Sequence, residues 1–338
     1  MSLRLHRRSA GCRPAVARRT RAQASALALA LLLAVMLALA PAAASAQAAP
    51  VPAAPAPAVQ TVRHQTPQNN FDASLLRMLA LALDKAPGAY ALEQWGGRME
   101  RGRSVQEVML GRNLDVLWAV TTRERERQMR PVRIPLDKGL SGWRLALIMQ
   151  QHSARFSAVR RLDDLADFTA GQGYGWAEGQ IWRANGLPVV TGNSSESLHA
   201  MLAAGRFDYF PRALGEAVRE SDQFAARGIV AAPGFVLHMQ SAVYFFVNNN
   251  NHALAAAIEQ GLRSAMQDGS FDKLFRELND SAIERARLAQ RHVIELANPE
   301  LPPETPLADK SLWFVPERVR SEAANEVRPP RQRPAPVQ

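Results

Sequence analysis

Two periods of apolar positions alternate along residues 59–287. Runs of adjacent apolar residues, typical of buried strands, are separated by stretches in which apolar residues recur every three or four positions, as in an amphipathic helix. The predicted strands are 59–65, 90–95, 114–120, 132–136, 143–149, 168–172, 188–191, 207–210 and 236–247. The predicted helices are 71–86, 105–110, 123–129, 162–165, 177–185, 195–204, 215–226, 252–266 and 268–287. This alternation predicts an α/β fold with mostly parallel sheets flanked by helices.

The order of these elements predicts two lobes. The chain begins one set of strands and helices, continues into a second set, and returns to the first. We expect lobe 1 to contain residues 61–146 and 239–317, and lobe 2 to contain residues 147–238. Two hinge strands would cross near Leu147 to Gln150 and near Phe235 to Met239, and would absorb the backbone change when the lobes move.

The first 46 residues predict export. Residues 1–24 carry seven arginines and no acidic residue, Ala26 to Ala40 is continuously apolar, and Ala44-Ser45-Ala46 is a small-x-small cleavage pattern. Cleavage would fall before Gln47 and would deliver the protein to the periplasm by the general secretory path. The alternative is an uncleaved membrane anchor, but the apolar stretch is shorter than the roughly 20 residues that span a bilayer.

Cleavage would change the charge and the cysteine content. The whole chain has a formal net charge of +10, and removing seven of its 41 basic residues leaves 34 against 31 acidic residues, a net charge of +3. A nucleic-acid-binding protein would be expected to keep a strong positive balance. The single cysteine, Cys12, is lost with the signal peptide, so the exported chain has no disulfide and depends on its core. We expect a monomer.

Two low-complexity segments flank the predicted fold. Residues 47–60 are almost entirely Ala, Pro, Val and Gln, and residues 318–338 are rich in Pro and Arg. Neither segment has enough apolar surface to offset its chain entropy. We therefore expect a linker before the lobes and a disordered basic tail after them.

Several motifs, taken in order, resemble the type 2 periplasmic solute-binding proteins, in the branch related to polar amino-acid uptake. The resemblance covers residues 60–300 and is carried by Gly111-x-x-x-Asp115, Arg123-Glu124-Arg125-Glu126 ahead of Pro131 to Pro135, Leu162-x-Asp164-Leu165, Gly205 to Asp208 and Asp268 to Phe271. The chain is also similar to uncharacterised exported proteins with the motifs Gly171-Gln172-Gly173…Trp176, Arg206 to Arg212 and Asn298 to Pro303.

This resemblance implies that two lobes close over a small polar ligand at the strand ends, for delivery to a membrane permease. Arg144 is the first candidate, because relatives use an arginine near the hinge strand to grip the ligand's carboxylate. A planar guanidinium suits that task, since it can donate two parallel hydrogen bonds. The alternative for Arg144 is an internal ion pair with Asp115 or Glu124.

Further ligand contacts follow from the same resemblance. Thr121 and Thr122 close the third predicted strand, where relatives use hydroxyl groups, although hydroxyl residues at strand ends also cap helices. Gly175 and Trp176 fall in a loop at a helix start, a geometry that suits anions. Trp176 replaces a threonine of the relatives and would either stack on a ligand or pack between the lobes.

Arg212 marks the largest departure from the relatives. Amino-acid-binding relatives place an acid a few residues beyond this strand to bind the ligand's ammonium group, whereas this chain has Arg212 and only later Glu216. Two arginines, Arg144 and Arg212, would favour an anion over a zwitterion. A dicarboxylate or another acidic metabolite is therefore as plausible a ligand as an amino acid.

Other chemistries find less support in the sequence. The seven histidines show no metal-binding spacing, so neither a metal nor a cofactor is expected. A sensory protein that partners a membrane receptor is one alternative to transport. An enzyme on the same fold, such as a dehydratase or lyase, is another; it would need a titratable acid in the cleft, for which Glu178 and Glu216 are candidates.

Overall fold

The computed structural model describes residues 58–97 and 101–316. The predicted signal peptide (1–46), most of the predicted linker (47–60) and the predicted tail (318–338) lie outside these residues. Within the described part of the chain, no helix is both long enough and apolar enough to cross a membrane.

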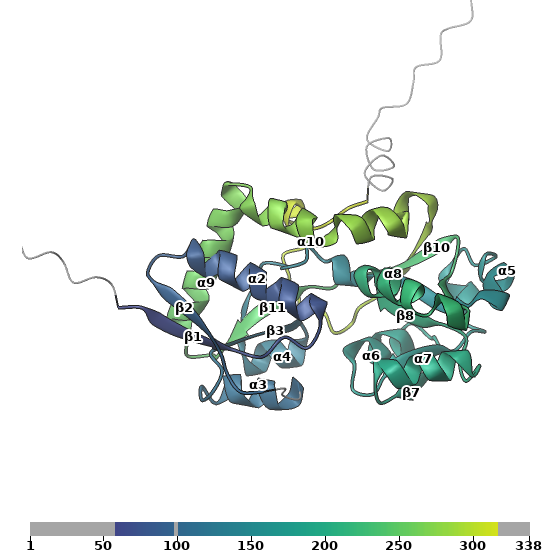
Figure 1. Cartoon of the computed structure of the whole chain (residues 1–338), viewed down its shortest axis with the longest axis horizontal. Helices are drawn as coiled ribbons and strands as arrows, with labels where there is room; N and C mark the ends of the chain where they lie inside the picture. Colours follow the sequence, from purple (N-terminus) through teal and green to yellow (C-terminus); the bar gives the residue numbers. More distant parts are fainter. Residues whose placement is uncertain (1–57, 98–100, 317–338) are drawn as a thin grey trace, which may run out of the picture. The chain divides into compact units, whose positions relative to one another are not determined.

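Lobe 1 is built on a five-stranded sheet in the order β2-β1-β3-β11-β4 (Figure 1). Its strands are β1 (Gln60–His64), β2 (Tyr90–Gln94), β3 (Val116–Val120), β4 (Arg130–Val132) and β11 (Val243–Val247). β1 is parallel to β2 and β3, whereas β11 is antiparallel to β3 and β4. The chain therefore returns to this sheet after building lobe 2, and it does so in the reverse direction.

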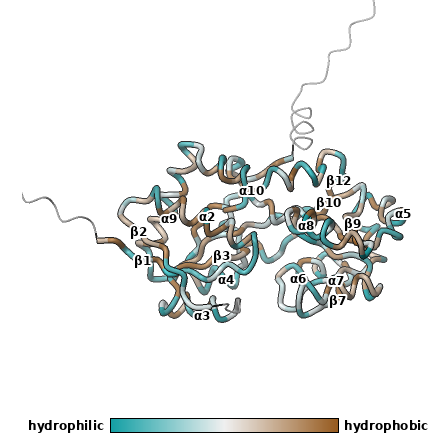
Figure 2. The backbone as a smooth tube through the Cα atoms, in the orientation of Figure 1, coloured by the Kyte–Doolittle hydropathy of each residue, from teal (hydrophilic) through white to brown (hydrophobic). Residues whose placement is uncertain are grey.

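The helices of lobe 1 are α2 (Asn70–Asp84), α3 (Arg101–Met109), α4 (Arg123–Gln128) and α9 (His252–Gln267). Alternate residues of a strand point to opposite faces of a sheet. Trp118 and Phe245 accordingly lie in one core with α2 and α9, while Leu117 and Phe246 lie in a second core with Val108 of α3. The mixture of hydrophobic and hydrophilic residues along α2 is visible in Figure 2.

Lobe 2 contains a sheet in the order β12-β10-β5-β8, with β9 also paired to β5, and a smaller β6-β7 sheet. The strands are β5 (Trp143–Met149), β6 (Ala170–Gly173), β7 (Val189–Gly192), β8 (Phe210–Ala213), β9 (Ile229–Ala231), β10 (Phe235–Met239) and β12 (His292–Leu296). A parallel bridge between Ala170 and Tyr209 connects the smaller sheet to the residue before β8. β5, along which the chain enters lobe 2, is antiparallel to β8, β9 and β10.

The helices of lobe 2 are α5 (Ser153–Phe156), α6 (Ala177–Ala184), α7 (Ser195–Ala203) and α8 (Leu214–Gln223). Short 3-10 helices across both lobes are η1 (Leu140–Gly142), η2 (Gln150–His152), η3 (Leu162–Leu165), η4 (Ala225–Arg227), η5 (Leu288–Gln290) and η6 (Lys310–Leu312). Under α6, the buried Trp182 Nε1 donates to Tyr209 Oη at 3.1 Å. Burial raises the pKa of Tyr209 above its ordinary value, so this hydroxyl stays protonated.

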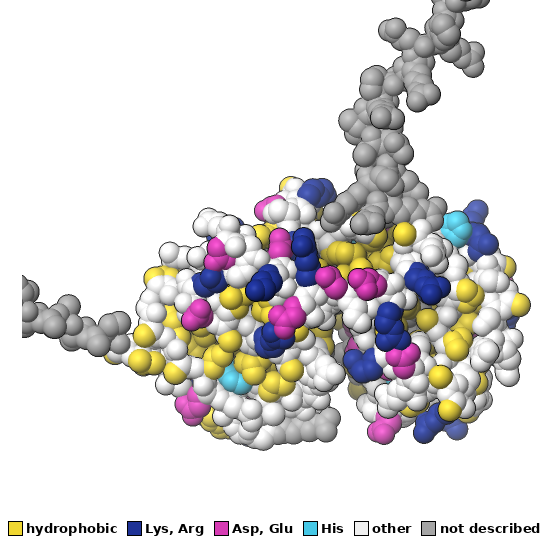
Figure 3. All heavy atoms as spheres, turned by 45° about the horizontal axis from the view of Figure 1, so that its top comes forward, with side chains coloured by type: hydrophobic (Ala, Val, Ile, Leu, Met, Phe, Trp, Pro, Cys, Tyr) yellow, Lys and Arg dark blue, Asp and Glu magenta, His cyan; other side chains and the backbone are white. Residues whose placement is uncertain are grey.

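Helix α10 (Ser270–Ala286) contributes side chains to the cores of both lobes. Phe271 belongs to the core under α2 and α9, while Phe275 belongs to a core with β5 and α8. On its surface, Glu277 pairs with Arg77 of α2, and Arg285 pairs with Asp222 of α8. Basic and acidic side chains are interspersed over the face shown in Figure 3. One continuous helix thus holds elements of both lobes.

The predicted α/β class and two-lobed organisation are confirmed, and most predicted elements lie within a few residues of the observed ones. The prediction of a strand at Trp143–Met149 matches β5, and Gly205 has the positive φ of +64° expected after α7. The predicted strand at 236–247 is in fact two strands, β10 and β11, separated by residues 240–242. The break falls at Gln240 and Ser241, and apolar, mostly buried residues on both sides gave the appearance of a single strand.

Several predicted boundaries differ from the structure. Residues 143–146 and β12, both assigned to lobe 1, pair instead within the sheet of lobe 2. The first crossing therefore lies before Trp143 rather than near Leu147, and the second follows Met239. The sheets are also more mixed than predicted, since β5 and β11 are antiparallel to their neighbours. Apolar periodicity identifies a strand but not the sheet or direction in which it pairs.

Replacing Gly261 with alanine should destabilise lobe 1, because α2 and α9 pack backbone to backbone at this glycine. A Cβ there would lie 1.8 Å from the carbonyl oxygen of Ala82. Overpacking of this kind costs about 1 to 3 kcal/mol, which should appear as a lower urea midpoint. Gly215→Ala is the matched control, since a Cβ at Gly215 meets nothing within 4 Å; equal stability of the two variants would contradict this packing.

Candidate functional site

One edge of the lobe 2 sheet adjoins both crossings between the lobes. The chain enters this sheet at Trp143 and leaves it at Met239. Arg144, the second residue of β5, pairs with Leu237 of β10 on one side and with Ala213 of β8 on the other. The start of β5 and the ends of β8 and β10 therefore lie together at the edge from which the chain passes to lobe 1.

The matching edge of lobe 1 is the carboxyl end of β3. Val243, where the returning chain enters the sheet, pairs with Val120 at the end of β3. The next residue, Thr121, donates its backbone N–H to the carbonyl of Ala242 at 2.8 Å. Thr121 and Thr122 thus lie beside the second crossing. These two strand-end edges, one in each lobe, define the candidate site.

Arg144 is buried and ion-paired within lobe 2. Its Nη2 lies 2.6 Å from Oε1 of Glu178 in the first turn of α6, and the two side chains are 6% and 15% exposed. The predicted alternative of an internal pair is correct in kind, but the partner differs, because Asp115 pairs with Arg63 and Glu124 pairs with Arg127.

The Nε of Arg144 is buried and has no hydrogen-bond partner among the described residues. A guanidinium has five N–H donors in a fixed plane, and leaving one unsatisfied in a buried position is costly. Gln172 of β6 shows the same feature, since it is fully buried and neither amide atom has a partner in the described chain. Both side chains therefore keep unused hydrogen-bonding capacity at this end of lobe 2.

Arg212 is held inside lobe 2 by two carboxylates. Its Nε and Nη2 each donate to Glu220 at 2.8 Å, and Nη2 also donates to Glu216 at 2.9 Å. Its guanidinium carbon lies 4.8 Å from the ring centre of Phe210 and 5.5 Å from that of Trp176. Burial alone would lower the pKa of Arg212, but the two glutamates outweigh burial and raise it.

The prediction that Arg212 and Arg144 together favour an anion gains no support from these contacts, because Arg212 is already paired with Glu216 and Glu220. Arg144 pairs across the sheet with Ala213, whereas Arg212 pairs with Leu145. Directly opposed residues share a face, so the two arginines point to opposite faces of the sheet. The anionic partner that a ligand was expected to supply is provided to Arg212 by Glu220.

His199 extends this buried network. Its Nε2 lies 3.1 Å from Oε2 of Glu220, and its ring packs at 4.3 Å from the ring of Phe224. Burial works to raise the pKa of Glu220, but hydrogen bonds from His199 and Arg212 outweigh it and hold the pKa below the ordinary value of 4.5. Glu220 is thus the ionised centre of the network.

The loop between β6 and α6 contains glycine and aromatic residues. Gly175 has a φ of +72° and faces open space, since a Cβ at this position would meet no atom within 4 Å, and Tyr174 is 79% exposed. Trp176 lies over Gly173, where a Cβ would be 2.1 Å from the indole, and its ring stacks 6.3 Å from Phe210. The indole therefore packs within lobe 2 rather than between the lobes.

Both threonines of lobe 1 have internal partners. Thr121 Oγ1 donates to Oε1 of Glu126 at 2.6 Å. Thr122 is the N-cap of α4, where its hydroxyl accepts the N–H of Arg125 at 3.1 Å. The guanidinium of Arg125 reaches back to the carbonyl of Val120. Helix capping, the alternative to ligand binding, is thus present at Thr122.

A contact between lobe 1 and the residues that follow β12 was not predicted from the sequence. The backbone N–H of Arg123, at the start of α4, donates to the carbonyl of Glu300 at 3.1 Å. Asn298 to Pro303 contributed to the resemblance, but nothing in their spacing linked them to the site. Gln172 was also overlooked, although a polar residue between two glycines of a buried strand is a detectable signal.

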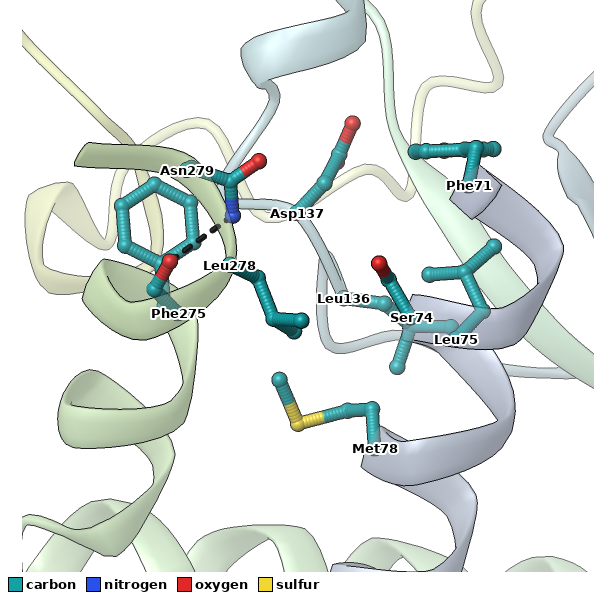
Figure 4. A pocket seen from close by; sticks show the side chains of 9 residues that line it. All are labelled: Phe71, Ser74, Leu75, Met78, Leu136, Asp137, Phe275, Leu278 and Asn279. Atoms are coloured by element: carbon teal, nitrogen blue, oxygen red, sulfur yellow. Dashed lines mark hydrogen bonds between the residues drawn. The ribbon is translucent and has the colours of Figure 1, made fainter. Parts of the chain in front are cut away.

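A pocket of about 320 Å³ is lined by residues of α2, of α10 and of the segment after β4 (Figure 4). These residues are Phe71, Ser74, Leu75, Met78, Leu136, Asp137, Phe275, Leu278 and Asn279. None of these residues was predicted to bind ligand. Burial raises the pKa of Asp137, although Ser141 and Gly139 donate hydrogen bonds to its carboxylate. The pocket follows from the packing of α2 against α10.

No protein-family model matches the chain, and no curated protein matches it. Among solved structures, the chain is similar to the probable amino-acid ABC transporter extracellular-binding protein ytmK from Bacillus subtilis, with 15% identity, a TM-score of 0.51, and coverage of 66% of this chain and 98% of that one. It is also similar to an ancestral arginine-binding protein bound to arginine (17% identity, TM-score 0.48, coverage 65% and 98%). A third is the ancestral amino acid-binding protein AncCDT-1, a precursor of cyclohexadienyl dehydratase (15% identity, TM-score 0.46, coverage 64% and 95%).

At this sequence identity, the likeness to ytmK shows the fold alone. The chain has the two-lobed type 2 periplasmic binding fold of amino-acid ABC transporter substrate-binding proteins. It covers 98% of the ytmK structure, so both lobes are included in the likeness.

Replacing Glu178 with glutamine should destabilise lobe 2, because it leaves the buried charge of Arg144 without its counter-ion. Removing one partner of a buried ion pair costs about 3 kcal/mol or more. Urea unfolding at pH 7 measures the loss. Glu124→Gln is the control, since its pair with Arg127 is exposed and should contribute less than about 1 kcal/mol; similar losses for both variants would contradict the assigned burial.

Acid should weaken the Glu220 network. The folded-state pKa of Glu220 lies below 4.5. Its contribution to the free energy of unfolding is therefore fully present above the unfolded-state pKa and is lost as pH falls through the folded-state pKa. The stability gap between wild type and Glu220→Gln should therefore be widest at pH 6 to 7 and should narrow below about pH 4.5. Urea midpoints across this range test it, and a gap independent of pH would show that Glu220 is not the titrating group.

Proposed function

We propose that this chain is an exported solute-binding protein whose two lobes close over a small polar ligand bearing a carboxylate, an amino acid or organic acid, for delivery to a membrane permease. The observation that carries the proposal is the buried Arg144 at the edge of lobe 2 adjoining both crossings, with an Nε that has no partner in the described chain. The shared fold supports the same conclusion.

In this proposal, Arg144 supplies the fork for the ligand's carboxylate. Glu178 holds the guanidinium through Nη2, which leaves Nε available for a further acceptor. A guanidinium held in place by an internal partner loses little side-chain entropy when a ligand arrives. The ligand would thus complete the hydrogen bonding of a charge that is already neutralised, and need not bring a net negative charge.

The remaining predicted residues take supporting roles. Thr121 and Thr122 present backbone groups at the carboxyl end of β3, and Gly175 allows a ligand to approach the backbone of the β6-α6 loop closely. Trp176 and Arg212 stabilise that loop from inside lobe 2 through their contacts with each other and with Phe210. They would position the loop rather than touch the ligand.

The predicted signal peptide supports export to the periplasm, where such proteins meet their permeases. A sensory role with a membrane receptor would use the same cleft and differ only in the partner. An enzymatic role is less well supported. The acids it would require, Glu178 and Glu216, are both engaged in ion pairs with arginines.

A thermal-shift screen of the chain from Gln47 onward against amino acids, dicarboxylates and other small anions tests the proposal. A ligand present at 100 times its Kd should stabilise the folded state by about 2.7 kcal/mol. Arg144→Lys keeps the charge but loses the planar fork, so it should reduce the shift at the same ligand concentration. Arg263→Lys, on the exposed face of α9, is the control. A shift unaffected by Arg144→Lys, or no shift with any compound, would contradict the proposed site.

A further inference from the structure

Three residues near the end of the described chain pack against the cores of both lobes. Leu312 is buried in the core of lobe 1 with α2 and α9, and the partly buried Trp313 packs against the same core. Phe314 packs instead against the core that contains β5 and α8. Residues 312–314, here termed the strap, thus pass from the core of one lobe to the core of the other.

The indole of Trp313 lies where the two crossings of the chain meet. A Cβ on Gly139, shortly before β5, would lie 2.6 Å from the indole and 3.2 Å from the carbonyl oxygen of Ser241, in the second crossing. The indole Nε1 donates to the carbonyl of Pro306 at 3.0 Å, which fixes the orientation of the ring. Trp313 and the second crossing therefore both pack against the backbone at Gly139.

Phe314 holds the same part of the first crossing through its backbone and its ring. Its N–H donates to the carbonyl of Lys138 at 2.7 Å. Its ring centre lies 6.4 Å from that of Trp143, edge to face at 84°, and 6.4 Å from that of Phe275 in α10. Aromatic pairs of this kind stabilise a structure beyond the area that they bury. Phe314 therefore connects the residues before β5 to β5 itself and to α10.

The turn that the strap covers is held by further contacts. Lys138 and Gly139 have φ values of +50° and +73°, and a positive φ is uncommon for a residue with a side chain. The carboxylate of Asp137, which lies between α2 and α10 (Figure 4), accepts the N–H groups of Gly139 at 3.1 Å and Ser141 at 2.8 Å. Lys138 Nζ pairs with Asp272 of α10 at 2.6 Å. The first crossing is thus anchored to α10 as well as covered by the strap.

These contacts oppose movement of one lobe relative to the other. Lobes move when the residues between them change their backbone angles. Such a change at Lys138 and Gly139 would break the hydrogen bond from Phe314 and displace the indole of Trp313 from Gly139. Packed contacts of this kind switch between discrete arrangements rather than deform continuously.

We propose that the strap is a conformational lock, which holds the two lobes in one arrangement until Trp313 and Phe314 leave the turn before β5. This inference concerns the movement of the lobes without ligand, and so goes beyond the proposed solute-binding function. With the strap in place the lobes have one arrangement, and its release gives access to a second. A ligand that requires the second arrangement would bind with its affinity lowered by the fraction of molecules in which the strap is released.

The test is a distance measurement between the lobes by double electron–electron resonance. The chain from Gln47 onward contains no cysteine, so spin labels can be attached at Ala80→Cys on α2 and Ala200→Cys on α7, both exposed. The labelled chain should give one narrow distance distribution. Adding Trp313→Ala should produce a second distance population, because loss of a packed indole should shift the equilibrium between the arrangements by about tenfold or more.

Phe156→Leu is the control, since this ring packs on Phe168 and Tyr209 inside lobe 2. It should keep the single distribution, and a second population in this variant would show that general destabilisation, not the strap, frees the lobes. Trp313→Phe, which keeps a ring at this position, should show less of the second population than Trp313→Ala.

Three results would overturn the lock. They are two populations in the labelled chain before any change to the strap, an unchanged distribution in folded Trp313→Ala, and a second population in the control. If circular dichroism shows that Trp313→Ala does not fold, Phe314→Leu replaces it, and an unchanged distribution in that variant overturns the lock equally. No ligand is added in any of these measurements, so failure of the lock leaves the solute-binding function standing, and an unsuccessful thermal-shift screen leaves the lock standing.

Discussion

The organisation of this protein depends on one constraint, namely that the chain must pass between two sheets at the ends of their strands. Trp143 and Met239 mark its first entry to and exit from lobe 2. A Cβ on Gly142 would lie 2.1 Å from the Met239 carbonyl, so these two crossings run in close contact. This passage brings the carboxyl end of β3 and the start of β5 to the same region. Helix α10 and residues 297–300 add further connections between elements of the two lobes around that region.

Buried charge in lobe 2 is arranged in compensated groups. Arg144 with Glu178, and Arg212 with Glu216, Glu220 and His199, place each guanidinium among acceptors, because an isolated buried cation would be prohibitively unfavourable. The attraction within each network offsets part of the desolvation cost of its charges, and Arg212 also packs against Trp176 in the loop that carries Gly175. The compensation also explains why the count of arginines near the strand ends is a poor guide to ligand charge.

Much of the fold was predictable because local physics repeats along the chain. The helical spacing of Leu75, Leu79 and Leu83, the apolar run ending at Val120 and the glycine after α7 each reflect a short-range rule, and each predicted element is present. The candidate site was predictable only in part. Arg144 was identified because the resemblance places an arginine at this point of the strand that leads to the hinge. Its partner Glu178 is 34 residues away and could not be chosen among the acids of the chain.

The sequence by itself determined the alternation of strands and helices, the two-lobed class and the presence of an arginine that needs an anionic partner, because all three depend on residue type and spacing. Tertiary structure decided which carboxylate meets which arginine, in which sheet β5 and β12 pair, and that Asn298 to Glu300 return to the edge of lobe 1. Those outcomes depend on contacts between residues far apart in the chain, and periodicity carries no information about them.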